Sequence, residues 1–264
     1  MTRVGSYMDL DTKVCVVTGV GAGIGAAIAD VFSSYGAHVI GLERDCASLN
    51  RTAERLAAKG GSLHPICADV SVEASVQSAF EAIASKYRSI DVLVNNVGVE
   101  FYKEFVSVSV EDWEHQLGVN LRSVFLCCSR AVPLMIKAGH GAIINTASVQ
   151  AFATTGQTAP YAAAKSGVLG LTRDMARDLG PHRIRVNAIC PGCIDTPMME
   201  RSLRRNGDAS NAKQKMQSAI PLGRLGDPGE VANAAAFLAS DLASYISGVA
   251  LVVDGGLLAQ LPVT

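Results

Sequence analysis

The sequence has little net charge, few aromatic side chains and no long apolar run. Its 264 residues carry 23 Lys and Arg against 24 Asp and Glu, which leaves a net charge of −1. That balance argues against the strongly basic surface typical of a nucleic-acid binder. No stretch approaches the roughly 18 uninterrupted apolar residues that cross a bilayer, so we expect neither nucleic acid nor a membrane as a partner. Residues 1–13 lack the apolar core of a signal peptide, and the expected location is cytoplasmic.

Charged residues make up 18% of the chain and hydrophobic ones 49%, which excludes disorder and allows a large core. The seven cysteines are odd in number and most lie in apolar runs, so we expect reduced, buried thiols rather than a disulfide framework. Cys190 and Cys193 have the spacing of a thioredoxin-like redox motif. Such motifs open a helix near the start of a much shorter fold, and we expect no redox role here. No second Cys/His pair has ligand spacing, so no metal site is expected.

Short β-rich apolar runs alternate with amphipathic runs along the chain. Strands are expected at 13–18, 38–42, 63–67, 91–95, 141–146, 183–189 and 250–253. Helices are expected at 26–35, 47–59, from an N-cap at Ser71 to about 86, and at 110–138, 160–179 and 228–240. This pattern predicts an α/β fold with a doubly wound, mostly parallel seven-stranded sheet between two helix layers, Rossmann-type. No linker divides it, so residues 1–264 are expected to form a single domain.

Residues 195–226 break the alternation with a polar, basic, Met-containing stretch. We expect a long loop at the carboxyl end of the sixth strand, where ligands bind in open α/β sheets, and interpret it as a substrate lid. Its basic side chains fit a solvated helical face better than a site for an acidic substrate such as an acyl carrier. They are Arg201, Arg204, Arg205, Lys213 and Lys215.

A glycine cluster, Thr18-Gly19-Val20-Gly21-Ala22-Gly23-Ile24-Gly25-Ala26, joins the first strand to the first helix. Glycines permit close approach of the backbone to a pyrophosphate, and a helix N-terminus offers free N–H groups, although an ordinary flexible turn is the alternative. Glu43 ends the second strand, where its carboxylate can accept hydrogen bonds from the ribose of NAD and repel the 2′-phosphate of NADP. Arg44 could instead hold that phosphate. The repulsion argument favours NAD over NADP.

Tyr161 and Lys165 stand four residues apart, hence on one face of a helix. Ser148 follows the fifth strand, and Asn120 lies in the long helix. With these residues in this order, the chain resembles the short-chain dehydrogenase/reductase family over essentially its whole length. Further motifs that carry the resemblance are Asp69-Val70, Asn95-Asn96-Val97-Gly98, Arg185-Val186-Asn187, Pro191-Gly192, Thr196-Pro197 and Asp254-Gly255-Gly256. The family more often has Ala at the position of Val97.

The resemblance implies an oxidoreductase in which Tyr161 is the general acid/base. A free Tyr has a pKa near 10, and we expect a nearby ammonium and the cationic nicotinamide to lower it. Lys165 would tune Tyr161 and hold the nicotinamide ribose, Ser148 would position the substrate oxygen, and Asn120 would anchor a water that leads protons to bulk. The cofactor carries the hydride.

The resemblance also implies a cofactor site. Its expected members are Gly19, Gly23, Ile24, Gly25, Glu43, Arg44, Asp69, Val70, Asn96, Gly98, Tyr161, Lys165, Pro191, Gly192, Ile194 and Thr196. The substrate pocket is expected to be walled by Glu100, Phe101, Gln150, Phe152, Gln157 and the lid.

Three functions remain open from the sequence. The first is an NAD-dependent dehydrogenase of a secondary alcohol or ketone, such as a sugar, polyol, cyclic alcohol or hydroxysteroid. The second is a 3-oxoacyl-thioester reductase using NADPH, favoured by the basic lid and opposed by Glu43. The third is a non-catalytic nucleotide-binding regulator, opposed by the presence of Tyr161 and Lys165. The resemblance further implies a homotetramer, with the helix from Val110 and the helix of Tyr161 at a subunit contact.

Overall fold

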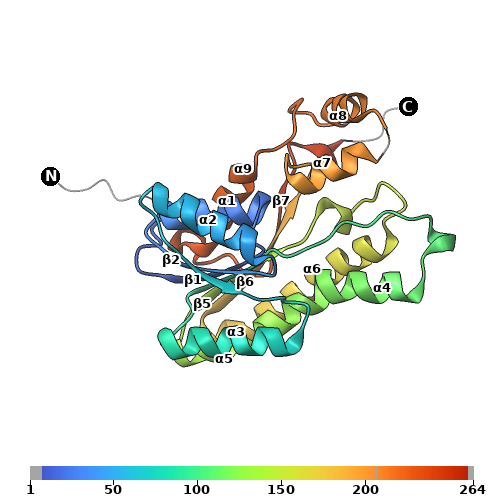
Figure 1. Ribbon diagram of the computed structural model, residues 1–264. Helices are drawn as coiled ribbons and strands as arrows, with labels where there is room; N and C mark the ends of the chain where they lie inside the picture. The colour runs from blue at the N-terminus through green and yellow to red at the C-terminus, as the bar shows by residue number, and fades with distance from the viewer. Residues whose placement is uncertain (1–7, 206, 261–264) are drawn as a thin grey trace.

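The computed structural model describes residues 8–205 and 207–260 and contains one sheet of seven parallel strands (Figure 1). The strand order is β3-β2-β1-β4-β5-β6-β7, so the chain reverses direction across the sheet between β1 and β4. The predicted fold class is confirmed. The strands are β1 (Val14–Thr18), β2 (His38–Glu43), β3 (Leu63–Cys67), β4 (Val92–Asn95), β5 (Gly141–Thr146), β6 (Ile184–Pro191) and β7 (Ala250–Val253).

Helices cover both faces of the sheet (Figure 1). One face is buried under α1 (Gly23–Ser34), α2 (Cys46–Ala58) and α9 (Pro228–Ala239). The other is buried under α3 (Glu73–Lys86), α5 (Ser123–Ala138) and α6 (Ala159–Leu179), with α4 (Val110–Leu117) leading into α5. Each layer has its own apolar core, and the sheet lies between them.

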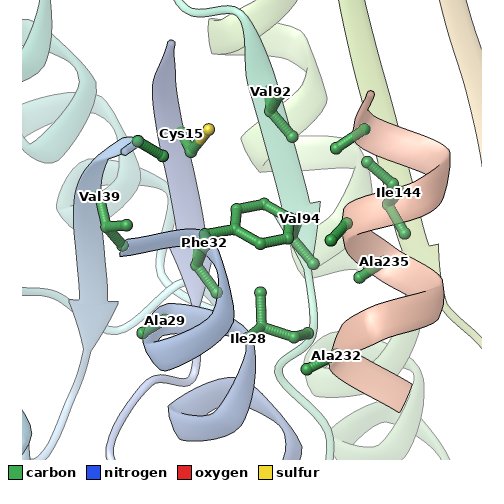
Figure 2. Close-up of a cluster of buried hydrophobic side chains, with 14 of the residues drawn as sticks. Cys15, Ile28, Ala29, Phe32, Val39, Val92, Val94, Ile144, Ala232 and Ala235 are labelled. Atoms are coloured by element: carbon green, nitrogen blue, oxygen red, sulfur yellow. The ribbon is translucent and has the colours of Figure 1, made fainter. Parts of the chain in front are cut away.

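Small side chains allow α1 and α9 to pack closely over the centre of the sheet. Figure 2 shows Ile28 and Phe32 of α1 beside Val94 of β4 and Ala235 of α9. All four side chains are fully buried. Alanines on α9 leave room for the Phe32 ring, so large and small side chains together fill the core between the helices and the sheet.

Residues Val110–Ala138 form one continuous helix that is long and apolar enough to cross a bilayer by length and composition alone. Half of its most apolar window is buried inside the fold. It packs against α3 and α6, and this packing accounts for its apolar composition. Its middle, Gly118–Arg122, is a π-helical turn between α4 and α5.

Two sequence predictions about helices were wrong. Ser71 does not cap α3: the helix begins at Glu73 after Val72, and the Ser71 hydroxyl donates to Asp69 instead (2.6 Å). The stretch 195–226 is not a long loop, because it folds into α7 (Pro197–Arg204) and α8 (Ala209–Ser218). Thr196 and Asp208 cap these helices through their side chains, and both belong to the residue types that favour the N-cap position.

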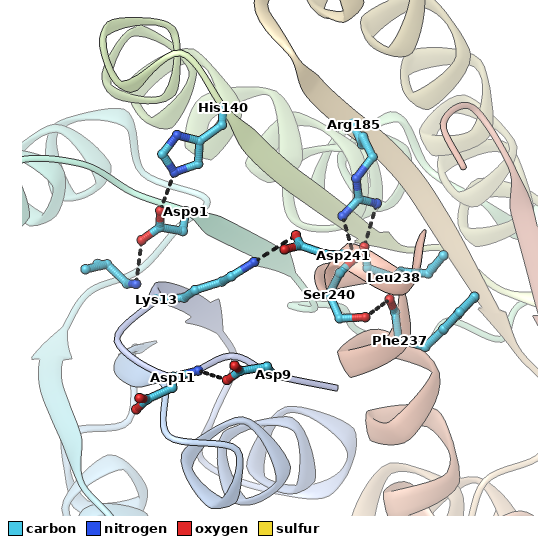
Figure 3. A network of polar contacts seen from close by, with 11 residues as sticks. Asp9, Asp11, Lys13, Asp91, His140, Arg185, Phe237, Leu238, Ser240 and Asp241 are labelled. Atoms are coloured by element: carbon cyan, nitrogen blue, oxygen red, sulfur yellow. Dashed lines mark hydrogen bonds and ion pairs between the residues drawn. The ribbon is translucent and has the colours of Figure 1, made fainter. Parts of the chain in front are cut away.

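A polar network ties the amino ends of the strands together, on the side of the sheet opposite the glycine loop (Figure 3). Asp91 accepts from the backbone N–H of Val14 (2.7 Å) and contacts His140 Nε2 (2.6 Å). Arg185 donates to the carbonyls of Leu238 (2.7 Å) and Ser240 (3.1 Å), which fixes the end of α9 against β6.

The cysteine prediction was wrong for one pair. Cys46 and Cys67 are exposed and joined by a disulfide, with their Cα atoms 5.3 Å apart. The other five are free thiols: Cys15, Cys127, Cys128 and Cys190 are buried, and Cys193 is half-buried. The apolar context of those five made them predictable. Cys46 and Cys67 are brought together only by the pairing of β2 with β3.

Candidate active site

The glycine loop lies at the carboxyl ends of β1 and β4, where the strand order reverses. This is the place where open α/β sheets bind ligands. Gly19 and Gly23 have φ angles of +74° and +56°, which side chains disfavour. A Cβ on Gly25 would come within 2.0 Å of the Gly19 carbonyl oxygen. The loop is therefore folded tightly against the start of α1, and Ala22 at the N-cap leaves the first N–H groups of that helix without a side-chain partner.

Asn96 joins this loop to β4. Its backbone N–H donates to the Thr18 hydroxyl (2.9 Å), and its side chain donates to the carbonyls of Thr18 (3.2 Å) and Gly19 (3.4 Å). Ile24 packs into the core, and Thr196 faces Gly23 from the start of α7, so the segment of α7 meets the glycine loop.

Glu43 lies beneath the glycine loop. Its carboxylate accepts from the N–H of Gly21 (3.2 Å) and from that of Asp45 (3.1 Å). A Cβ on Gly21 would come within 2.9 Å of that carboxylate, so a larger residue here would have to displace the Glu43 side chain. The negative charge is thus fixed beside the loop, and each carboxylate oxygen keeps a second lone pair for a hydroxyl group. Arg44 follows with an exposed side chain.

Asp69 and Val70 follow β3 on the same side of the sheet. Asp69 accepts from both the N–H (2.9 Å) and the hydroxyl of Ser71. Burial of Asp69 opposes ionisation, but these hydrogen bonds outweigh it and hold the pKa of the carboxyl below its ordinary value. Val70 is buried in the core. The two residues and Glu43 frame one end of the crevice.

The four predicted catalytic residues lie together around the carboxyl end of β5. Lys165 is buried, donates to the Thr146 carbonyl (2.8 Å) and has its Nζ 5.7 Å from the centroid of the Tyr161 ring. The Ser148 hydroxyl lies close enough to Tyr161 to act against the rise in its pKa. Asn120 is close behind Lys165, since a Cβ built on Gly98 would lie 2.9 Å from Asn120 Oδ1 and 3.3 Å from Lys165 Nζ.

Asn120 owes its position to the π-helical turn. Its side-chain amide donates to the Gln116 carbonyl (3.1 Å) and to the Val99 carbonyl (3.1 Å), and its Oδ1 accepts from the Val99 N–H (3.0 Å). The side chain therefore provides hydrogen-bond partners for the backbone of Gln116 in the helix and of Val99 in the segment after β4. It is fully buried.

Burial shifts the pKa of Tyr161 in the direction opposite to the one predicted from the sequence. It raises the pKa of Tyr161 to about 12, against the favourable Ser148 contact and with added repulsion from Tyr102 and Glu100. It lowers the pKa of Lys165 to about 8. In the chain alone, the phenol is therefore held protonated, and the predicted lowering of its pKa is not found.

The mouth of the site contains a cluster that the sequence did not reveal. Tyr102 accepts a hydrogen bond from Ser202 of α7 (2.8 Å), and the Arg205 guanidinium lies 3.8 Å from the centre of its ring. Burial raises the pKa of Glu100, while Arg201 and Arg205 act to lower it. Arg201 and Arg205 are exposed, as expected of a solvated helix face, yet their charge reaches the pocket. Tyr102 lies two residues after Glu100, a spacing that places both on one side of an extended segment.

The other predicted wall residues are less deeply placed. Gln150 accepts from Thr158 (2.7 Å) and its N–H donates to Ser148, which connects it to the catalytic group. Phe101 is half-buried, and Phe152 and Gln157 are exposed. Gln157 has a φ of +60° and its carbonyl accepts from Lys103 (2.7 Å).

The segment after β6 leads from the sheet to α7. Gly192 donates to Val253 (3.0 Å), and a Cβ there would come within 2.7 Å of Asp254. Pro191 and Ile194 are buried, and Ile194 forms a parallel bridge with Gly226. That bridge holds the two ends of the 195–226 segment side by side. Among the described residues, no group of three or more His, Cys, Asp or Glu side chains is arranged to hold a metal ion.

Comparison with known proteins accounts for this arrangement. Residues 19–258 match a family model described as enoyl-(acyl carrier protein) reductase. A solved short-chain dehydrogenase/reductase from Burkholderia xenovorans has a TM-score of 0.92 and 40% identity, over 96% of this chain and 98% of that one. The chain belongs to the short-chain dehydrogenase/reductase family.

Its relatives in this family act on different substrates. The 3-oxoacyl-[acyl-carrier-protein] reductase FabG of Thermotoga maritima is 39% identical over 95% of this chain and 99% of its own. The D-threitol dehydrogenase of Mycolicibacterium smegmatis is 38% identical over 94% and 93%. A solved NAD(P)-dependent gluconate 5-dehydrogenase from Beutenbergia cavernae, with bound NADP, has a TM-score of 0.90 and 35% identity over 97% and 100%. As a family member, the chain is an oxidoreductase of the kind that uses NAD(P).

Proposed function

We propose that this protein is an NAD-dependent dehydrogenase of a polar secondary alcohol, or reductase of the matching ketone, with Tyr161 as general acid/base. The observation that carries the proposal is the convergence of Tyr161, Ser148 and Lys165 at the carboxyl end of β5, beside a tightly folded glycine loop at the point where the strand order reverses. The polar mouth formed by Glu100 and Tyr102 favours a substrate with several hydroxyl groups.

The contacts of these residues support a path for the proton. Ser148 holds the substrate oxygen, and Tyr161 takes the hydroxyl proton in oxidation or returns it in reduction. Lys165 and Asn120 continue the path towards Val99 and bulk water. A bound oxidised nicotinamide would supply the hydride acceptor and a positive charge that favours the phenolate. Gly19, Gly23, Glu43, Asp69 and Asn96 are the residues that would hold its adenosine and pyrophosphate.

Replacing Tyr161 with Phe tests the assignment. We expect the rate of alcohol oxidation to fall by about 10²–10⁴, because the proton acceptor is lost. NADH binding, followed by cofactor fluorescence, should remain. The assay is NAD-linked turnover across polyols, including threitol, cyclic alcohols and hydroxysteroids. Tyr245→Phe is the control, since Tyr245 is fully exposed. Turnover that survives in Tyr161→Phe would refute the role.

The preference for NAD rests on the charge of Glu43. Glu43→Gln keeps a hydrogen-bond acceptor for Gly21 and removes the repulsion of a 2′-phosphate. We expect the ratio of kcat/KM for NAD to that for NADP to fall about tenfold or more, because one unit charge acts at short range. Glu54→Gln, an exposed change on α2, should leave the ratio unchanged. An unchanged ratio in Glu43→Gln would contradict the assignment.

A second candidate is a 3-oxoacyl-thioester reductase using NADPH. The similarity to FabG and the cationic Arg201 and Arg205 favour it. Against it, Glu43 carries a negative charge at the expected adenosine ribose, and Arg205 is stacked on Tyr102. Turnover of a 3-oxoacyl thioester with NADPH, compared with polyol oxidation with NAD, separates the two. The non-catalytic alternative is disfavoured by the intact Tyr161–Lys165 pair.

We also propose that α7 and α8 act as the substrate lid and that the chain assembles as a cytoplasmic homotetramer from single-domain subunits. The apolar groove between α5 and α6 supports the assembly. Its apolar members are Leu117, Leu121, Phe125 and Leu171. Phe125 is 57% exposed in the single chain, which a neighbouring copy would cover.

A further inference from the structure

The disulfide between Cys46 and Cys67 lies beside the proposed cofactor site. Cys46 is the first residue of α2, three positions after Glu43, and Cys67 is the last residue of β3, two positions before Asp69. In the sheet, Glu43 and Cys67 are paired directly, and Ala68 donates to the Glu43 carbonyl (2.9 Å). The covalent bond thus connects the two segments that frame the adenosine end of the crevice.

Both sulfur atoms lie around the backbone of Arg44. Cys46 Sγ is 3.9 Å and Cys67 Sγ 3.7 Å from the Arg44 carbonyl oxygen. Together with the hydrogen bond from Ala68 to Glu43, the bond encloses the turn from β2 to α2, which is the turn that positions the Glu43 carboxylate. Without it, this turn is held by hydrogen bonds from Gly21 and Asp45 to Glu43.

These two cysteines are also the accessible ones. Both are exposed, whereas four of the remaining five are buried and Cys193 is half-buried. Cys46 lies in the first turn of α2, whose N–H groups favour a thiolate. Accessible sulfurs within bonding reach can exchange with small thiols and disulfides in solution, which buried sulfurs cannot.

We propose that Cys46 and Cys67 form a reversible redox site that sets the affinity for the cofactor. The inference rests on the proposed cofactor site at Glu43. In the oxidised form, the β2–α2 turn is pre-organised and the adenosine half binds tightly. In the reduced form, the turn gains freedom that binding must remove, and affinity falls.

The oxidant is a low-molecular-weight disulfide such as oxidised glutathione. The Cys46 thiolate attacks one sulfur of that disulfide, forms a mixed disulfide and releases one small thiolate. The Cys67 thiolate then attacks Cys46 Sγ and releases the second. Two protein thiols lose two electrons, the small disulfide gains them, and the two protons are carried by the released thiols. Excess small thiol reverses both steps.

The experiment compares the full-length chain after treatment with oxidised glutathione and after treatment with dithiothreitol. Iodoacetamide labelling of the native protein and peptide mass spectrometry report the Cys46–Cys67 bond without reference to any cofactor. NADH fluorescence titration gives the dissociation constant of each form. We expect two more labels on the reduced protein, and an NADH dissociation constant about threefold to tenfold higher than in the oxidised protein.

Cys46→Ser and Cys67→Ser should each bind NADH as the reduced protein does under both treatments. Cys193→Ser is the matched control and should keep the full redox shift. Failure of oxidised glutathione to form the bond, or equal NADH affinity in both forms, would overturn the proposal. Loss of NADH binding under both treatments, with the bond still forming, would instead refute the proposed cofactor site and with it the regulatory role.

Discussion

Burial moves the pKa values of Tyr161 and Lys165 in opposite directions. A phenol becomes harder to ionise and an ammonium easier to neutralise when water is removed, so the two pKa values move apart, to about 12 for Tyr161 and about 8 for Lys165. At neutral pH both groups therefore keep their protons in the chain alone, and the positive charge of a bound nicotinamide would be needed to lower the pKa of Tyr161 for its role as a base. Spacing on the helix predicted which residues meet, but only the packed site determines how deeply they are buried.

The lowered pKa of Lys165 predicts a specific dependence of stability on pH. Between the folded value near 8 and the ordinary value of 10.5, the unfolded chain binds more protons than the native one, so stability rises with pH. From pH 8 to pH 10, Lys165 should contribute an increase of about 2 kcal/mol in the free energy of unfolding. Urea denaturation of the wild type and Lys165→Met checks this. Equal changes with pH in both proteins would contradict the assignment.

The positions of some site residues could be predicted from the sequence, and those of others could not. Gly19, Glu43, Ser148 and Tyr161 follow strands or open helices, so local patterns place them at one edge of the sheet. Tyr102 and Ser202 are 100 residues apart and meet only because α7 folds back over the segment after β4. No local periodicity encodes such a contact.

At the scale of elements, the π-helical turn between α4 and α5 decides where Asn120 points. The apolar periodicity predicted one helix over 110–138, and this is confirmed as a continuous helical stretch. The extra residue in its middle was not predictable, because it depends on the partners that Val99 and Gln116 offer to the Asn120 amide. The segment 195–226 was also misjudged at this scale, since short polar helices have weak apolar periodicity.

Replacing Asn120 with Ala should damage both stability and turnover. The change removes the hydrogen bonds that the amide makes with the backbone of Val99 and Gln116, which destabilises the fold by about 1–3 kcal/mol. It also interrupts the proposed path of the proton from Lys165 to bulk water. Chemical denaturation and steady-state kinetics measure the two effects. Asn50→Ala, on the exposed side of α2, is the control. Unchanged stability in Asn120→Ala would show that the amide does not hold the π-helical turn.

At the scale of the whole molecule, the α5–α6 layer presents an apolar groove with an exposed Phe beside it. Phe125 stands out from the helix together with the half-exposed members of the groove. An exposed Phe beside an apolar groove is typical of a protein–protein interface. The parallel sheet and its two helix layers followed from the alternation of elements, whereas the proposed assembly rests on the family resemblance and this surface.

Introducing a charge at Phe125 tests the assembly. Phe125→Glu places a carboxylate in the proposed contact, and we expect the homotetramer to dissociate into smaller species. Light scattering coupled to size-exclusion chromatography gives the mass of each species. Leu242→Glu is the control, because Leu242 is similarly exposed (52%) and lies beside Asp241, near the amino ends of the strands. A wild-type protein that elutes as a monomer would refute the proposed state directly.

The bridge between Ile194 and Gly226 has an engineering consequence. Gly226 donates to Cys193 (2.9 Å) and Asp195 donates to Gly226 (2.8 Å), so the segment leaves and rejoins the scaffold at one fastened point. The two helices between those hinges, α7 and α8, can therefore be exchanged as one unit, while the contacts at the amino ends of the strands stay unchanged (Figure 3). Grafting the corresponding helices of a threitol or butanediol dehydrogenase onto this protein should therefore change which alcohol is accepted while the sheet and its cofactor site stay the same.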